Sequence, residues 1–252
     1  AGQDLQVAPR SVDLNLLEGV LRPEEIEALL AEARRVAGSF SLGKDSVDGQ
    51  PSAEFQLIDD GKWKPEATGM QQVLERPLRE LLDKIMELQG ESSQELWPVQ
   101  SWIRRYAPGE RREHPVHYDH KSMVTAVCSL TPPRHGSGLY VQKGPHVSSR
   151  EWVDFGSAGT FAVHGWDLAH GVDVRGDEER FSLILFLKPM ADIRSGSSSW
   201  YRPLAEAGNA LAAYRIAMDL EAEHNIPEAR EFYRKAADQG HWVSMHRLGM
   251  LM

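Results

Sequence analysis

Histidine is concentrated in the middle of this sequence. The chain of 252 residues has ten histidines, and seven of them fall within the 57 residues from 114 to 170. These seven are His114, His117, His120, His135, His146, His164 and His170. An even distribution would place only about two there. Because imidazole is the commonest metal ligand and a common acid or base, residues 100–190 are the first region in which to look for chemistry.

A histidine and an aspartate two positions apart, His117 and Asp119, form the most informative pair. Side chains at i and i+2 of a strand share a face, so these two can aim at one point. They supply two of the three ligands of the two-histidine, one-carboxylate triad that binds Fe(II) and leaves coordination positions open. The third ligand must come from another strand, where His164 and His170 compete. We favour His170, because a Gly-Val pair follows it and an arginine lies ten residues later.

That arginine, Arg180, opens the last β-type run of the histidine-rich region, in the sequence Arg180-Phe-Ser182. A guanidinium group presents a planar set of donors that can hold a carboxylate through two parallel hydrogen bonds. The sequence therefore predicts that a carboxylate could be bound close to the metal.

In this order and spacing the chain resembles the 2-oxoglutarate- and Fe(II)-dependent dioxygenases, specifically the branch similar to prolyl 4-hydroxylase catalytic domains. The resemblance covers about residues 12–190 and includes a leading helix after Pro23 and a long helix before Tyr106. The matching motifs are the Tyr106 to Gly109 approach, His117-x-Asp119, Thr125, the Gly136 to Tyr140 turn, Gly159, His170-Gly-Val and Arg180-x-Ser182.

The resemblance implies an α+β fold, with a double-stranded β-helix (jelly-roll) core and supporting N-terminal helices. The catalytic metal ligands that it implies are His117, Asp119 and His170. It also implies that Arg180 binds the distal carboxylate of 2-oxoglutarate, assisted by Ser182 and Tyr106. The expected cofactor is Fe(II), the co-substrates are 2-oxoglutarate and dioxygen, and ascorbate is a candidate reductant.

The activity that follows from the resemblance is that of a hydroxylase acting on a peptidyl or small-molecule substrate, with oxidative decarboxylation of 2-oxoglutarate to succinate. One alternative is a catalytically idle metal-binding module that presents helical repeats to a protein partner. A second is a cupin-type metal isomerase or hydrolase, which would share the barrel without needing Arg180.

The segments around these residues indicate how they would be positioned. Residues 11–18 could form a strand, a helix is expected after Pro23, and a second helix is expected over about 71–88, while residues 39–53 have the composition of a loop. From residue 98 to 189 the chain shows short β-type runs separated by turn residues, which is typical of a sandwich or barrel. We therefore expect an oxygenase domain over residues 1–192.

The C-terminal part has a different pattern. Residues 193–202 are expected to be a linker, and residues 203–252 to form a helical hairpin and a third helix. Two glycines 32 residues apart, Gly208 and Gly240, lie in similar alanine-rich surroundings. This segment resembles a Sel-one-like repeat, a relative of the tetratricopeptide repeat, which implies a protein or peptide partner. A plain helical cap on the oxygenase core is the alternative.

Charge and cysteine content restrict the other function classes. The formal net charge of −9 argues against nucleic acid or an anionic membrane as the main partner. The single cysteine, Cys128, excludes a disulfide framework within the chain and is expected to be buried. Residues 1–5 show no basic segment followed by an apolar run, so we expect an intracellular, cytoplasmic setting.

Overall fold

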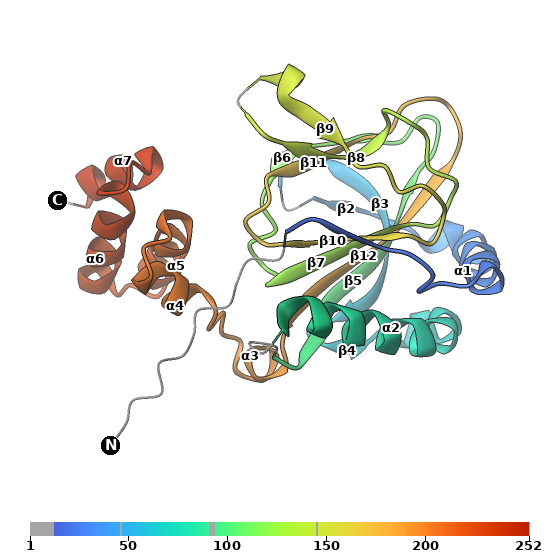
Figure 1. Cartoon of the computed structure of the whole chain (residues 1–252), viewed down its shortest axis with the longest axis horizontal. Helices are drawn as coiled ribbons and strands as arrows, with labels where there is room; N and C mark the ends of the chain where they lie inside the picture. The colour runs from blue at the N-terminus through green and yellow to red at the C-terminus, as the bar shows by residue number, and fades with distance from the viewer. Residues whose placement is uncertain (1–12, 46, 91–93, 145, 252) are drawn as a thin grey trace. The chain divides into compact units, whose positions relative to one another are not determined.

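The computed structural model describes residues 13–45, 47–90, 94–144 and 146–251, shown in Figure 1. The expectation about a targeting segment at residues 1–5 lies outside these ranges. The chain divides into two compact units. The first comprises residues 11–90 and 94–193, and the second contains residues 194–252.

The first unit contains a large antiparallel sheet with the strand order β1-β10-β7-β12-β5-β3-β2, and β4 pairs with β3. Its strands are β1 (Asn15–Leu17), β2 (Ser41–Lys44), β3 (Pro51–Asp59), β4 (Lys62–Trp63), β5 (Leu96–Tyr106), β7 (Val124–Ser129), β10 (Phe161–Gly165) and β12 (Arg180–Pro189). The central strands β7 and β12 are rich in β-branched and aromatic residues and are almost wholly buried, as expected for the middle of a sheet.

A smaller antiparallel sheet has the order β6-β11-β8-β9. Its strands are β6 (Glu113–His117), β8 (Gly138–Gln142), β9 (Arg150–Trp152) and β11 (His170–Asp173). A buried apolar cluster joins residues of both sheets: Val127, Leu139, Val141, Val153, Phe155 and Ala162. Two antiparallel sheets with a shared core are compatible with the expected jelly roll.

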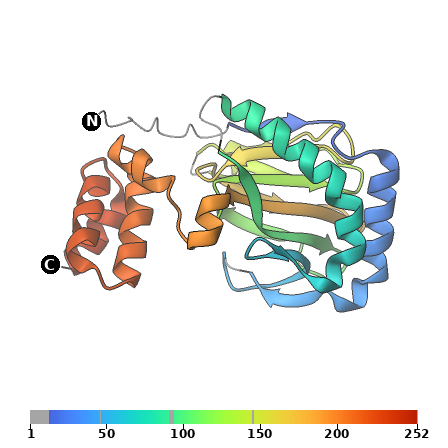
Figure 2. The same ribbon diagram turned by 90° about the horizontal axis from the view of Figure 1, so that it is seen from below.

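Two helices, α1 (Pro23–Arg35) and α2 (Thr68–Gln89), lie across the strands of the large sheet (Figure 2). The first begins at Pro23, where a missing amide hydrogen costs nothing, and it buries Leu29 and Ala33. Arg76 of α2 fastens the two helices together, because its Nε donates to Glu25 Oε1 at 2.7 Å and its Nη2 to the carbonyl of Val20 at 2.7 Å. Short 3₁₀ turns, η1 (Ala37–Ser39), η2 (Pro65–Ala67) and η4 (Val147–Ser149), complete the unit.

The prediction of a loop over residues 39–53 is wrong in part, because β2 and the start of β3 lie there. Glycine, serine and proline suggested a loop locally, but β3 pairs with β5 over six residue positions between Ala53 and Asp59. Pairing with a strand more than 40 residues away overrides the local preference. This hairpin matters for function, since it forms one wall of the cavity described below.

The second unit is helical, with α4 (Tyr201–Glu206), α5 (Ala210–Ala222), α6 (Ile226–Ala237) and α7 (Trp242–Met250). The predicted linker, 193–202, is partly helical, because it holds the end of α3 (Met190–Ser195) and the start of α4. Asn209 caps α5 by accepting a hydrogen bond from the amide of Ala212 at 2.9 Å. The similarity to Sel-one-like repeats stays a prediction.

The last helix leaves apolar side chains exposed. Trp242 is 75% exposed and Met245 is 50% exposed, whereas Leu248 and Leu251 are half-buried. We expect residues 203–252 as a whole to dock on the oxygenase core or on a second copy of the chain, and this stays a prediction. Among the described residues, no helix is both long and apolar enough to cross a membrane.

A chain ending at Ser195 is expected to unfold in a single cooperative transition and to keep the metal affinity of the full chain. The reason is that the apolar cluster and the strands that carry the candidate site all lie within residues 11–193. Circular dichroism melting and Co(II) titration would check this. A shortened chain that is folded but binds metal poorly would show that the C-terminal helices support the site directly.

Candidate metal and carboxylate site

His117 and His170 meet because their strands pair. They are 53 positions apart in the sequence, yet they are direct cross-strand partners in the antiparallel β6–β11 ladder. Their ring centroids are 4.4 Å apart. Close approach of neighbouring strands also explains the glycine after His170: a Cβ at Gly171 would lie 2.4 Å from the hydroxyl oxygen of Tyr140.

Both imidazoles are oriented by their own backbone. Nδ1 of His117 lies 2.8 Å from the carbonyl oxygen of Pro115, and Nδ1 of His170 lies 2.9 Å from that of Leu168. A carbonyl can only accept, so each Nδ1 carries a proton, and in the neutral form of each ring Nε2 keeps its lone pair. This is the arrangement of metal-binding histidines, in which a second contact fixes the ring and its tautomer.

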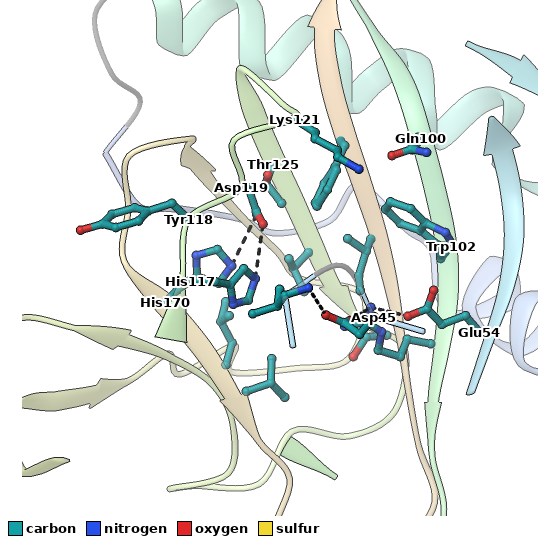
Figure 3. A pocket seen from close by; sticks show the side chains of 18 of the residues that line it. Asp45, Glu54, Gln100, Trp102, His117, Tyr118, Asp119, Lys121, Thr125 and His170 are labelled. Carbon is teal, nitrogen blue, oxygen red and sulfur yellow. Dashed lines mark hydrogen bonds and ion pairs between the residues drawn. The ribbon is translucent and has the colours of Figure 1, made fainter. Parts of the chain in front are cut away.

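Asp119 lies between the two rings. Its Oδ1 is 3.4 Å from Nε2 of His117, and its Oδ2 is 3.4 Å from Nε2 of His170, as Figure 3 shows. The carboxylate is not on the strand, which ends at His117, so the expectation that both ligands follow one strand is corrected. A turn places it instead, since Ser122 donates through its amide and its hydroxyl to the carbonyl of Asp119.

The protonation states of Asp119 and His170 suit the binding of a metal cation. Burial by itself raises the pKa of Asp119, but the adjoining His170 and His117 outweigh it and hold that pKa well below its ordinary value. Burial lowers the pKa of His170 to about 3. An ionised carboxylate therefore faces a neutral imidazole at pH 7. The ligand atoms of His117, Asp119 and His170 all lie within 4.8 Å of one another, so the three could hold one metal ion.

His164, the competing third ligand, is not part of this group. It lies on β10, is fully buried, and does not line the cavity in front of the three ligands. Its Nε2 is 3.9 Å from Oδ2 of Asp119. The structure thus places His170 in the group of potential ligands and His164 behind it.

Arg180 reaches the same cavity from the first position of β12. It is 8% exposed, and its Nε is buried without a hydrogen-bond partner. No carboxylate of the described residues forms an ion pair with it. Gly138 leaves space for this guanidinium group, because a Cβ at Gly138 would lie 1.9 Å from Nη1 of Arg180. A buried guanidinium without a counter-ion is costly, and an anionic ligand would relieve that cost.

The other arginines near the motif have hydrogen-bond partners within the protein. Arg105 pairs with Glu110 and Arg111 with Asp48 at 2.6 Å, whereas Arg112 donates to backbone carbonyls. The guanidinium groups of Arg105 and Arg111 are therefore already paired with carboxylates.

A buried charged network that the sequence did not reveal forms the wall opposite the metal ligands. Nη2 of Arg104 lies 3.0 Å from Oδ2 of Asp45 and also contacts Glu54. His114, one of the seven clustered histidines, is 1% exposed, and its Nδ1 lies 3.2 Å from Asp45 Oδ2. Asp45 lies directly after β2, in a segment that the sequence indicated to be a loop, and for this reason the network was not predicted.

The predicted site residues all line one cavity of about 260 Å³. The six that line it are Tyr106, His117, Asp119, His170, Arg180 and Ser182. Tyr106 is the cross-strand partner of Arg180, and Ser182 follows Arg180 by two positions on the same face of β12. The lining also includes residues that the sequence did not single out, among them Asp45, Glu54, Gln56, Gln100, Trp102, Lys121 and Phe186. Trp102 and Phe186 pack edge to face, with centroids 5.1 Å apart.

No protein-family model and no curated protein sequence matches this chain. Solved structures do resemble it. A prolyl-4-hydroxylase from Pseudomonas putida is 21% identical, with a TM-score of 0.51 over 69% of this chain and 92% of that one. An oxidoreductase of the 2OG-Fe(II) oxygenase family from Burkholderia pseudomallei is 18% identical, with a TM-score of 0.50 over 74% and 89%.

A third structure, the non-heme alpha-ketoglutarate-dependent carbocyclase SnoK from nogalamycin biosynthesis, is 15% identical, with a TM-score of 0.50 over 74% of this chain and 84% of that one. At these identities the comparisons establish a shared fold. The first unit therefore has the fold of 2-oxoglutarate-dependent oxygenases.

The buried His114 predicts a loss of stability in acid. Burial lowers its pKa from 6.5 to about 4, so between these values the unfolded chain binds a proton that the folded chain does not. Stability must then fall as the pH falls from about 6.5 to about 4, by up to about 3 kcal/mol for this group. His114→Gln should remove that part of the slope in urea unfolding at a series of pH values. An unchanged slope would contradict the assignment.

The contact at Gly138 predicts a steric effect on anion binding. Gly138→Ala should push the guanidinium of Arg180 aside and weaken 2-oxoglutarate binding at least about tenfold, since charged hydrogen bonds contribute about 1.5–3 kcal/mol each. Gly136→Ala is the matched control. Both glycines have positive φ, +104° and +67°, but nothing lies within 4 Å of a Cβ at Gly136. Equal binding by the two variants in calorimetric titration would show that the contact does not matter.

Proposed function

We propose that this protein is an Fe(II)- and 2-oxoglutarate-dependent oxygenase, in which His117, Asp119 and His170 hold the metal. Two histidines and one carboxylate converge on a single point beside Arg180, which no carboxylate of the described residues pairs with, and this carries the proposal. The donor set suits Fe(II), because two imidazoles and one carboxylate leave coordination positions open. When bound, Fe(II) and 2-oxoglutarate supply the oxidation of substrate by dioxygen, with release of succinate and carbon dioxide.

The protein's own side chains bind and orient 2-oxoglutarate. Arg180 receives the distal carboxylate of 2-oxoglutarate, and the room above Gly138 lets its guanidinium present two donors together. Tyr106 and Ser182 offer hydroxyl groups from the same wall of the cavity. The apolar side chains of Val127, Leu139 and Ile184 line the cavity as well and limit the access of water to the reacting groups.

The reaction that we favour is hydroxylation or a related oxidation, since Asp119 supplies the carboxylate that hydroxylases of this kind use as a ligand. The substrate would be peptidyl or a small molecule. The similar structures include both kinds of enzyme by name, a prolyl-4-hydroxylase and a carbocyclase of nogalamycin biosynthesis. A cavity of about 260 Å³ has the size for a small molecule or for a single extended side chain.

The proposal predicts that the protein with Fe(II) converts 2-oxoglutarate slowly to succinate even without substrate. Arg180→Ala should raise the concentration of 2-oxoglutarate needed by at least about tenfold, from the loss of charged hydrogen bonds. Arg79→Ala is the control, because that side chain is 73% exposed on α2 and does not line the cavity. Succinate can be measured by mass spectrometry.

The same experiment separates the proposal from its alternatives. A protein that binds the metal but forms no succinate, with or without candidate substrates, would support an idle metal-binding module. Metal-dependent chemistry that proceeds without 2-oxoglutarate and is indifferent to Arg180 would support a cupin-type isomerase or hydrolase.

A further inference from the structure

The cavity has a wall, formed by β3 and β5, that the proposed 2-oxoglutarate site does not use. Glu54 is the cross-strand partner of Arg104, and Gln56 is that of Trp102, so these four side chains are neighbours on one face of the sheet. All four line the cavity, as does Gln100. Figure 3 shows the carboxylate of Glu54 and the ring of Trp102 on the opposite side of the cavity from the metal ligands.

This wall carries an excess negative charge. Two carboxylates contact the guanidinium of Arg104, that of Asp45 at 3.0 Å and that of Glu54. His114 adds no charge to the cluster. Its Nε2 lies 3.0 Å from Nη1 of Arg104, and because a guanidinium can only donate, that nitrogen carries no proton. One positive charge therefore faces two negative charges, and a partly buried negative charge without a counter-ion is costly.

Glu54 is the carboxylate that remains open to a ligand. Both oxygens of Asp45 have partners, since Oδ1 accepts from the amide of Val47 at 2.8 Å and Oδ2 faces Arg104 and His114. Glu54 contacts Arg104 through Oε1 alone, and its side chain is 18% exposed, compared with 4% for Asp45. Oε2 of Glu54 can therefore accept from a group in the cavity.

Other polar groups around the cavity also present acceptors. Nε2 of Gln100 donates to Oδ1 of Asp59 at 3.3 Å, which leaves Oε1 of Gln100 for a ligand. The hydroxyl of Ser122 donates to the carbonyl of Asp119, so its 2.8 Å contact with the hydroxyl of Thr125 must use the proton of Thr125. Thr125 lines the cavity, and toward a ligand its hydroxyl can only accept.

The donors of the cavity lie elsewhere. They surround Arg180 at the start of β12, where they suit 2-oxoglutarate, a dianion that only accepts. Gln100 and Thr125 instead flank Phe186, six positions further along β12. Trp102 lies between Gln100 and Glu54 in Figure 3, and the face of an indole ring attracts cations. A carboxylate, an amide oxygen and an indole together favour a ligand group that is positively charged and rich in N–H donors.

We propose that the wall formed by β3 and β5 binds a positively charged nitrogen group of the substrate, an amine or a guanidinium, through Glu54 and Trp102. This inference rests on the proposed function and deepens it, because it gives the charge of the group that lies opposite the metal ligands. Such a group supplies the counter-charge that the cluster of Arg104, Asp45 and Glu54 lacks.

Lys121 is the competing determinant of substrate charge. It lines the same cavity and has no ion pair with a carboxylate of the described residues, so it could bind an anionic substrate. Its side chain is exposed, however, and water satisfies an exposed ammonium group at little cost. The partly buried Glu54 has the greater need of a partner, and for this reason we favour a cationic substrate.

Two probes of nearly the same size and shape test the charge, N-butylguanidinium and its neutral isostere N-butylurea. Calorimetric titration uses the full chain with Zn(II) and saturating 2-oxoglutarate, because Zn(II) has no redox chemistry and 2-oxoglutarate fills the site at Arg180. Butylguanidinium should bind at least about tenfold more tightly than butylurea, since it forms a charged hydrogen bond. Glu54→Gln should reduce this ratio to within a few-fold, and Trp102→Leu should weaken butylguanidinium binding several-fold.

Glu75→Gln is the matched control. It removes the same charge from a side chain that is 74% exposed on α2 and does not line the cavity, so the ratio should not change. If Glu54→Gln does not fold, the comparison of the two probes on the unaltered protein still decides the question. N-acetylarginine methylamide distinguishes the sources of the cation: tighter binding than butylguanidinium indicates a peptidyl substrate and weaker binding a small molecule, and both results support the inference.

Several results would overturn the inference. One is equal binding of butylguanidinium and butylurea by the unaltered protein, or binding of neither. A ratio that persists in Glu54→Gln would remove the role of Glu54. Tighter binding of pentanoate than of butylguanidinium, lost in Lys121→Met, would show that the substrate is anionic. Failure of the unaltered protein to bind Zn(II) and 2-oxoglutarate would overturn the proposed function, and this inference with it.

Discussion

The candidate site depends on one cross-strand pair. His117 ends β6 and His170 begins β11, and the antiparallel pairing of these strands places the two imidazoles side by side. The turn after β6 then places the carboxylate of Asp119 close to the Nε2 atoms of both histidines. A shift of the ladder by one residue would send one imidazole to the opposite face of the sheet, since side chains alternate along a strand. The register of this ladder therefore determines whether the two imidazoles can face the same point.

The charged groups of the cavity differ in their partners and in their protonation. Burial lowers the pKa of His170 to about 3, whereas at His117 the contact with Asp119 outweighs burial and raises the pKa. Arg104 is held by Asp45 and Glu54 on the opposite wall, whereas no described carboxylate pairs with Arg180. This difference between the two buried guanidinium groups is the reason that we propose Arg180, and not Arg104, as the group that binds the co-substrate.

Close packing explains glycines that would otherwise look like loop residues. Gly138 leaves space for the guanidinium of Arg180, and Gly171 lets β11 approach Tyr140 and the backbone of His114. The cavity is therefore shaped partly by the absence of side chains. The same principle links the two sheets, since the strands that carry Arg180 and His170 must approach closely enough for both groups to line one cavity.

The sequence by itself predicted the type of chemistry that we propose. The spacing of His117, Asp119, His170 and Arg180, together with the family resemblance that these residues carry, predicted the β-rich core and six residues that line the cavity. It could not decide what depends on contacts between distant segments. The β2–β3 hairpin was taken for a loop, the burial of His114 was not predicted, and His164 competed with His170 as a ligand. Only the tertiary structure could decide these points, because burial and partner choice arise from strands that are far apart in the sequence.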